Sequence, residues 1–442
     1  MDVTVGRQTW VGSPVTRLED EPLLRGRGRF LDDLDPVPNT KHAAVLRSEL
    51  AHARVVRLDA TRALELPGVV GVLTGADVER LCRPLSAGIR SVAFPFRPAA
   101  ADVTRYVGEP LAVVVAGDRY VAEDALELVE VEYEPLEPVL DPLRAAEGET
   151  MVSERTFRYG DPDAAFAAAH VVVRERFRFP RWTGLPLECH GVIADWDDAT
   201  GTLTAWANFQ GPFTLHSVAA AALGLPGSKL RLITPPDSGG SYGIKSSVYA
   251  YVVLIGLASR RLGVPVRWIE DRLEHLAASS ASTERITDVE AAFAEDGQLL
   301  ALRYDVVEDV GAYVRAPEPA TLYRMHGSLG GAYRVANVAV RNRVVLTNRC
   351  PTGLNRGFGG PQLYLALERT MALAASRLGL DPVELARRNL LEAHEFPYST
   401  PSGGVYDSGD YGACLDVGDA LGRCGARSEM LEPVFELSLI HI

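Results

Sequence analysis

The chain has 442 residues, enough for two or three domains with cores of their own. It is 47% hydrophobic and 23% charged, an ordinary globular composition, and its formal net charge of −13 argues against broad binding to nucleic acids or anionic membranes. Its start lacks the basic segment and apolar run of a signal peptide, and its longest apolar run, 248–258, is about half the ~20 residues that a membrane span needs. We therefore expect a soluble, cytoplasmic protein with no nucleic-acid or membrane partner.

The cysteines and histidines show no metal-binding spacing. The five cysteines lie far apart without a Cys-x-x-Cys pair, which favours neither a disulfide framework nor a zinc site and leaves no ligand set for an iron–sulfur cluster. The histidines lack HxxH and HExxH spacing, so we predict no metal held by protein side chains. The cysteines are Cys82, Cys189, Cys350, Cys414 and Cys424.

Short β-branched runs alternate with a helical pattern between residues 41 and 140. The helix signal is "DRYVAEDALELV", in which Val121, Ala125 and Val129 share one face, and it follows the apolar strand "LAVVVA". Alternation and prolines close the unit at "EVEYEPLEPVL". We predict a compact α/β domain over 1–145. The predicted strands before the helix are 42–48, 53–59, 69–74 and 111–116.

The next stretch, 146–165, is polar and without a clear period, so it is predicted to be a linker. Strand and helix patterns then resume and predict a second domain over 166–425. Beyond it, 426–442 loses all periodicity and ends on an apolar run, which we interpret as a non-native or truncated tail. The second domain's signals are a strand at 170–179, a hairpin across 197–202, a helix at 212–224, a strand at 229–234, a hairpin across 295–297 and a helix at 361–379.

A glycine-rich stretch, "TPPDSGGSYGIKSS" at 234–247, lies between a predicted strand and an apolar helix. A nucleotide-binding P-loop is a remote alternative, because Gly239 and Gly243 are one residue too close and Ile244 separates Gly243 from Lys245. A tight turn without a ligand is the simplest interpretation. However, free N–H groups at a helix start suit an anion or a metal-oxo ligand, and glycine lets backbone approach it.

A second glycine-rich turn, "TNRCPTGLNRGFGGPQ" at 347–362, precedes the long helix. Together with "FQGP" and "GGSYGIK", it resembles the molybdopterin-binding large subunit of the xanthine dehydrogenase, aldehyde oxidase and aerobic carbon monoxide dehydrogenase family. The resemblance extends over nearly the whole chain, through "YVGEPLAVVVAGDRYVAEDALE", "VPVRWIEDRLEHL" and "LGLDPVELARRNLL". It implies an α+β fold, with an α/β hammerhead domain followed by the first part of the molybdenum-cofactor-binding domain.

The resemblance also implies a reaction. Enzymes of this family hydroxylate an aldehyde or a carbon beside nitrogen in an aromatic heterocycle, with water as the oxygen source. The implied cofactor is molybdenum–molybdopterin, in the cytosine dinucleotide form. Electrons would pass to an iron–sulfur small subunit and an FAD-binding medium subunit, because neither cofactor's motif occurs in this chain. The intact assembly would be a dimer of heterotrimers.

Three residues match the family's catalytic positions. Gln210 corresponds to the glutamine that hydrogen-bonds the apical oxygen on molybdenum, and a neutral amide can do so without exchanging a proton. Phe358 would place a flat ring against a planar substrate. Arg324 has the spacing of the substrate-pocket arginine, which would stabilise developing negative charge, although a surface arginine is an equal alternative. The cofactor-binding positions implied by the resemblance are Gln210, Gly239, Gly240, Tyr242, Gly243, Arg356 and Gly357.

Departures from the family pattern narrow the implied function. Ser246 stands where purine-oxidising members have a glutamate, and Gly357 stands where the carbon monoxide dehydrogenases have a cysteine that Cys350 is too distant to replace. The family's general base, a glutamate in a downstream Gly-Glu turn, does not occur, and Glu368 and Glu384 lie in helix patterns. The resemblance therefore implies that this chain alone is inactive. The alternative is a truncated or non-catalytic homologue that folds without holding a complete cofactor.

Overall fold

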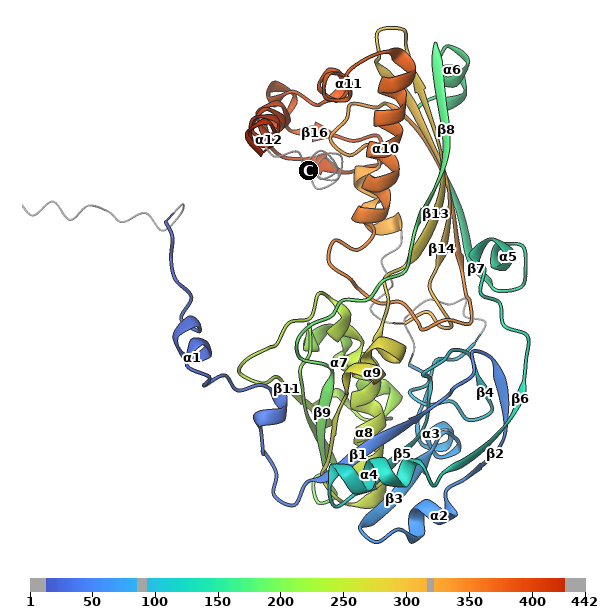
Figure 1. The fold of residues 1–442 in the computed structure, drawn as a ribbon, viewed down its shortest axis with the longest axis vertical. Helices are drawn as coiled ribbons and strands as arrows, with labels where there is room; N and C mark the ends of the chain where they lie inside the picture. The colour runs from blue at the N-terminus through green and yellow to red at the C-terminus, as the bar shows by residue number, and fades with distance from the viewer. Residues whose placement is uncertain (1–12, 86–93, 316–321, 426–442) are drawn as a thin grey trace, which may run out of the picture.

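The computed structural model describes residues 13–85, 94–315 and 322–425. These residues form two lobes stacked along the long axis of the molecule (Figure 1). The lower lobe in that view contains a seven-stranded and a three-stranded sheet, and the upper lobe contains a five-stranded sheet. Helices pack on mixed parallel and antiparallel sheets, so the predicted α+β class is confirmed. The predicted tail, 426–442, lies outside the described residues.

The seven-stranded sheet draws its strands from both predicted domains. Its two parts join where β1 and β12 run parallel, with Lys41 opposite Val266 and His42 opposite Arg267. The boundary predicted at 145 therefore separates two sequence segments but crosses one continuous sheet. In sheet order the strands are β11 (Leu230–Ile233), β10 (Thr202–Ala207), β9 (Gly191–Asp197), β12 (Val266–Ile269), β1 (Lys41–Arg47), β5 (Pro110–Ala116) and β3 (Val69–Thr74).

Helices cover both faces of this sheet. The apolar run noted in the sequence forms α8 (Tyr249–Leu262), which is buried from Tyr249 to Ser259 because it packs between the sheet and α7 (Pro212–Ala222). On the other face lies α4 (Arg119–Leu126), which begins where the Asp118 carboxylate accepts the Val121 N–H at 2.9 Å. The predicted helices at 118–129 and 212–224 are confirmed within a few residues.

A three-stranded sheet and short helices complete the lower lobe. The sheet has the order β4 (Val103–Thr104), β2 (Ala53–Asp59), β6 (Glu130–Pro135). The short helices of the lobe are α2 (Thr61–Glu65), α3 (Gly75–Leu81) and α9 (Arg272–Glu274), whereas α1 (Asp20–Leu24) lies apart from it on the N-terminal segment (Figure 1).

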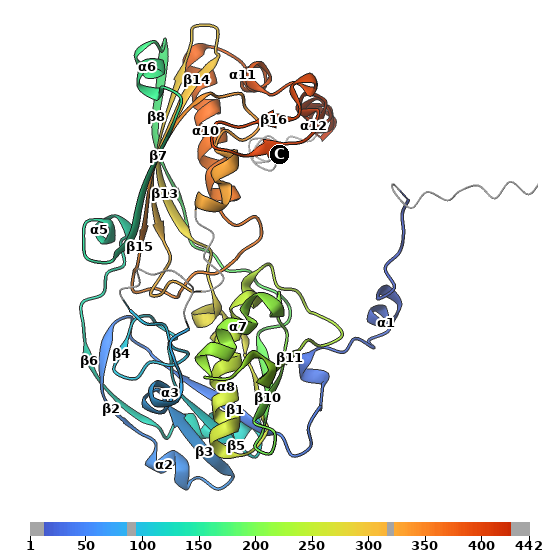
Figure 2. The same ribbon diagram turned by 180° about the vertical axis from the view of Figure 1, so that it is seen from behind.

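The upper lobe is a sheet with a long helix across one face (Figure 2). The helix is α10 (Gly360–Leu378), whose Leu367 and Met371 pack with Phe293 and Leu302 of the sheet. The hairpin predicted across 295–297 is confirmed as the connection of β13 and β14. The strand order is β7 (Met151–Tyr159), β15 (Asn337–Val345), β14 (Leu299–Asp309), β13 (Glu284–Phe293) and β8 (Val171–Phe179). The further elements are the helices α5 (Pro142–Ala146), α11 (Pro382–Asn389) and α12 (Tyr411–Gly425), and the paired strands β16 (Tyr398–Ser399) and β17 (Val405–Tyr406).

The linker predicted at 146–165 is wrong. This segment contains β7, which pairs antiparallel with β15, and the start of α6 (Pro162–Ala167). The sequence signal was weak because β7 is an edge strand with no buried side chain, so it needs no apolar alternation. Across the described residues, no helix is long and apolar enough to cross a membrane.

Candidate cofactor site

The first glycine-rich loop, 239–243, connects β11 to the short helix before α8. Its backbone conformation requires glycine at Gly243, which has φ +105° and where a Cβ would lie 2.7 Å from the Leu354 carbonyl oxygen. A Cβ on Gly239 would lie 2.3 Å from Glu188 Cβ. Tyr242 has φ +53°, an uncommon value for a residue with a side chain. The loop is therefore held close to two other segments, and larger residues cannot replace these glycines.

A buried ion pair holds the base of this loop. The Lys245 ammonium is fully buried and lies 2.5 Å from Glu188 Oε2, which also accepts the Gly239 N–H at 3.0 Å. Burial acts to raise the pKa of Glu188, but Lys245 outweighs it and the pKa is lowered; burial lowers the pKa of Lys245. The pair is therefore charged and structural. It leaves Lys245 unavailable to a phosphate, which removes the P-loop alternative.

Ser241 fixes the orientation of the predicted catalytic Gln210. Its Oγ accepts the N–H groups of Gly243 at 3.1 Å and Lys245 at 3.2 Å, so its own proton is free to donate, and it donates to Gln210 Oε1. The Gln210 amide group consequently keeps its NH2 as a donor for another ligand. This is the role that the family resemblance assigns to the residue. Ser241 was not singled out from the sequence, since serine is common in glycine-rich turns.

The second glycine-rich loop, 355–359, lies against the first. The Arg356 N–H donates to the Tyr242 carbonyl at 2.7 Å, and the Arg356 guanidinium lies 5.6 Å from the centroid of the Tyr242 ring. Gly357 has φ +79°. Arg324 lies over the Phe358 ring at 5.5 Å. An unbroken series of contacts thus runs from Gln210 through both loops to Arg324.

The loops offer free donors and unpaired polar atoms. Among the described residues, the N–H groups of Gly240, Ser241 and Gly357 have no hydrogen-bond acceptor. Asn355 is 3% exposed, yet both polar atoms of its side-chain amide lack a partner there. Orphaned buried amides are rare, and a polar ligand would satisfy them. The residues present therefore fit a cofactor rich in oxygen atoms. Asn355 lines a small cavity together with Arg356 and Phe358. Two further polar atoms of its lining, Thr283 Oγ1 and Gln362 Oε1, also lack a partner within the described part of the chain.

Ser246, which departs from the family pattern, and the two glutamates considered as substitutes for the general base all have structural partners. The Ser246 hydroxyl is buried and donates to the Gly243 carbonyl at 2.7 Å. Where purine-oxidising members have a glutamate, this chain therefore has a serine bonded to the loop backbone. Glu368 accepts from the Tyr333 hydroxyl at 2.5 Å within the upper lobe. Glu384 pairs with Arg388 at 3.0 Å. Neither glutamate touches the two loops in these contacts, as expected from the sequence.

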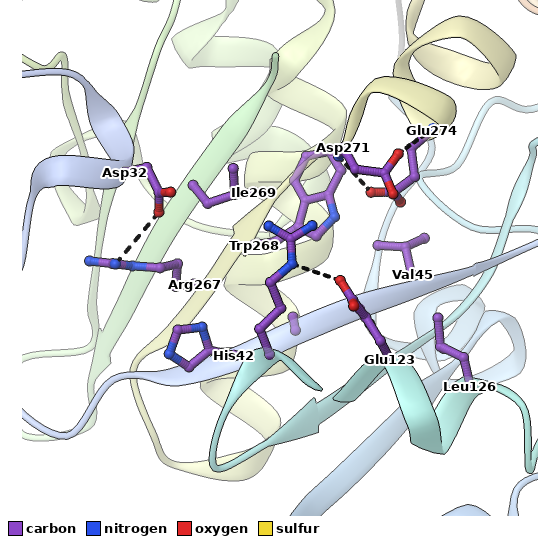
Figure 3. A pocket seen from close by; sticks show the side chains of 13 residues that line it. Asp32, His42, Val45, Glu123, Leu126, Arg267, Trp268, Ile269, Asp271 and Glu274 are labelled. Carbon is purple, nitrogen blue, oxygen red and sulfur yellow. Dashed lines mark hydrogen bonds and ion pairs between the residues drawn. The ribbon is translucent and has the colours of Figure 1, made fainter. Parts of the chain in front are cut away.

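A larger cavity, of about 300 Å³, lies elsewhere, between β1, β12 and α4 (Figure 3). It contains none of the predicted site residues, so it is distinct from the candidate cofactor site. Its charged lining is largely paired internally, for example Arg119 with Glu123 at 2.6 Å. The charged residues that line it are Asp32, Arg119, Glu123, Arg267, Asp271 and Glu274.

The structure also gathers residues that no sequence spacing connected. The ligand atoms of Cys189, Glu270 and His275 all lie within 4.8 Å of one another. More than 80 residues separate Cys189 from the other two, so no short motif could have indicated the cluster. The sequence prediction that no protein side chains hold a metal rested on local spacing alone.

Two family models match this chain. Residues 25–137 match the α/β hammerhead domain of aldehyde oxidase and xanthine dehydrogenase, and residues 145–390 match the molybdopterin cofactor-binding domain. The chain belongs to this family of molybdopterin-binding subunits. The predicted fold, a hammerhead domain followed by a cofactor-binding domain, is confirmed.

Individual relatives agree with this membership. The chain is 36% identical over 428 residues to the gamma subunit of the 6-hydroxypseudooxynicotine dehydrogenase complex of Paenarthrobacter nicotinovorans (91% of this chain, 53% of that protein). It is 35% identical to the carbon monoxide dehydrogenase large chain of Afipia carboxidovorans (91% and 52%). The structure of quinoline 2-oxidoreductase from Pseudomonas putida 86 matches with a TM-score of 0.88 at 35% identity (94% and 54%).

The chain thus spans about half the length of these relatives. A shorter relative also exists. The nicotinate dehydrogenase large molybdopterin subunit of Eubacterium barkeri is 30% identical, and the match covers 90% of this chain and 92% of that protein.

Proposed function

We propose that this chain forms one wall of a molybdenum-cofactor site in an enzyme that hydroxylates an aldehyde or an aromatic N-heterocycle. The observation that carries the proposal is the series of contacts that joins Gln210, both glycine-rich loops, Phe358 and Arg324 on one exposed face. Family membership supports the cofactor, and the names of relatives that act on quinoline or 6-hydroxypseudooxynicotine support a heterocyclic substrate.

Each residue of the chain has a defined task in this proposal. Ser241 turns the Gln210 amide so that its NH2 donates to the cofactor, and the free N–H groups of loop 239–243 bind its oxygen atoms. Phe358 stacks on a planar substrate, and Arg324, held over that ring, stabilises negative charge that develops on the substrate. The bound cofactor supplies the oxidation chemistry, with water as the oxygen source.

The rest of the assembly belongs to the proposal as well. We propose the cytosine dinucleotide form of the cofactor, electron transfer to separate iron–sulfur and FAD subunits, and a dimer of heterotrimers. The general-base glutamate would come from polypeptide beyond the half matched here, either in a longer chain or in a second one. The relative of similar length, named a large molybdopterin subunit, supports the two-chain arrangement.

Cofactor analysis tests this proposal directly. The chain, produced in a host that makes molybdenum cofactors, should copurify with molybdenum and with pterin that releases CMP on mild acid hydrolysis. Gly240→Val should lower the molybdenum content at least about tenfold, since a side chain there would block the approach of backbone to the cofactor.

The matched control is Gly201→Val, which also has positive φ but has no atom within 4 Å of the added Cβ. It should keep wild-type molybdenum content. A wild-type chain that carries neither molybdenum nor pterin would contradict the expectation that this wall suffices to retain the cofactor, and would favour the alternative of a homologue that folds without holding it.

A further inference from the structure

We propose that Cys189, Glu270 and His275, with His190 as the fourth ligand, form a binding site for Zn²⁺ or a divalent ion of similar ligand preference. The potential ligand atoms of the first three residues lie within 4.8 Å of one another. Zinc bonds of about 2.0–2.3 Å in a tetrahedron place ligand atoms roughly 3.3–3.7 Å apart. Side-chain movements of about 1 Å would therefore bring the ligand atoms of these three residues to such spacings.

The contacts of His275 require either a proton or a metal ion between two of these groups. Its Nε2 is 3.1 Å from the Gly184 carbonyl oxygen, which only accepts, so Nε2 carries a proton. Its Nδ1 is 2.8 Å from Glu270 Oε2. Two lone pairs cannot face each other at that distance, so either a proton or a metal ion must separate them. A metal-binding histidine typically has its other nitrogen held by a carbonyl in this way.

His190 provides the independent observation. It is fully buried, and neither ring nitrogen has a hydrogen-bond partner among the described residues; Glu270 Oε1 also lacks one. Its Nδ1 lies 3.6 Å from Glu270 Oε2. Buried polar atoms without partners cost free energy, and a coordinated ion would remove that cost.

A divalent ion would be neutralised by these ligands. A Cys189 thiolate and the Glu270 carboxylate supply two negative charges, and the neutral imidazoles add none, so the ligand set balances the charge of the ion.

The surrounding cations already have hydrogen-bond acceptors, of which the acceptor of Lys245 is a carboxylate, and an entry path exists. Lys245 is neutralised by Glu188, and Arg272 donates to the Pro186 and Leu187 carbonyls. Arg315 donates to the carbonyl oxygens of neighbouring loops. Cys189 itself is only partly buried, which lets an ion reach it. A bound ion would fasten segment 184–190, which positions the first glycine-rich loop through Glu188, to the end of β12.

Cobalt substitution tests the site in the full chain, prepared without a histidine tag. Co²⁺ should bind one per chain and give the near-ultraviolet charge-transfer band of a thiolate–cobalt bond. Zn²⁺ should displace it and remove the band. Absence of the charge-transfer band would overturn the proposal. Because these measurements need no molybdenum cofactor, their outcome is independent of the proposed function.

Variants identify the ligands. Cys189→Ser should abolish the band, and Cys189→Ser and His275→Gln should each weaken Zn²⁺ binding by more than about 100-fold. Cys414→Ser is the matched control, because Cys414 is exposed on α12, and it should leave both properties unchanged. A band of unchanged intensity in Cys189→Ser would overturn the assignment.

Alkylation of the wild-type chain keeps the test decisive if these variants fail to fold. Zn²⁺ should slow the reaction of Cys189 with iodoacetamide at least about tenfold, since coordination masks the thiolate, and should leave Cys414 unaffected. Equal Cys189 rates with and without Zn²⁺ would contradict the site.

Discussion

The two glycine-rich loops of the candidate site differ in how far contacts within the protein hold them in place. Loop 239–243 is held in place from within the protein, because Glu188 accepts the Gly239 N–H, Ser241 accepts the Gly243 N–H, and Gly243 packs against the Leu354 carbonyl. Loop 355–359 leaves the buried Asn355 amide without partners among the described residues. The difference indicates that the first loop is preorganised before a ligand arrives, whereas the second depends on one. The following variants test that contrast, from the largest expected effect to the smallest.

The strongest test is Glu188→Gln, which leaves the buried Lys245 ammonium without a countercharge. We expect a loss of about 3–4 kcal/mol in the free energy of unfolding, measured by urea titration. The double variant Glu188→Gln/Lys245→Met should recover part of that loss. Asp288→Asn, which removes a solvent-exposed pair with Arg176, should change stability by less than about 1 kcal/mol. Equal effects at the two positions would mean that the first loop is not held by its buried pair.

Next comes Gly243→Ala, which combines a strained φ with a contact to backbone. We expect a loss of about 2–3 kcal/mol, again from urea titration, because the added Cβ would lie 2.7 Å from the Leu354 oxygen. Gly224→Ala has φ +67° and no atom within 4 Å of its Cβ, so its cost should be only about 1 kcal/mol. If both variants lose the same amount, backbone conformation alone explains the glycine and the close contact contributes nothing.

A pH series tests the upper lobe that carries the second loop. Burial raises the pKa of Glu368 to about 7, against an ordinary value of 4.5. The unfolded state therefore loses its proton first as the pH rises. The stability that this group contributes is full below about pH 4.5 and is lost as the pH rises through 7.

Glu368→Gln removes this titration while keeping an acceptor for the Tyr333 hydroxyl. Its free energy of unfolding relative to wild type should rise by about 2–3 kcal/mol between pH 4.5 and 8. Glu384→Gln, an exposed position on α11, is the control and should show no such trend. A flat difference for Glu368→Gln would exclude the raised pKa.

The smallest change in stability is expected for Asn355→Leu. Removing a buried amide that has no partner among the described residues should leave the free energy of unfolding within about 1 kcal/mol of wild type, or raise it slightly. The same variant should lose most of its molybdenum, measured by elemental analysis of the purified protein. Normal molybdenum content would show that the unpaired amide does not serve the cofactor, which would remove the proposed contrast between the loops.

The amino-acid sequence by itself determined most secondary structure, the two family domains and the identity of the glycine-rich loops. These are short-range properties: periodicity marks the buried face of a helix such as α4, and a glycine pair marks a turn whose backbone must be bare. The edge strand β7 was not predicted from the sequence, because an exposed strand needs no apolar pattern.

Only the tertiary structure decided which distant residues meet. Ser241 orients Gln210 across 31 positions, Glu188 neutralises Lys245 across 57, and Cys189 approaches Glu270 and His275 from another strand connection. One sheet also unites strands of both domains through the short β1–β12 pairing. Such contacts depend on how sheets and helices pack, and packing is a property of the whole chain that no local pattern records.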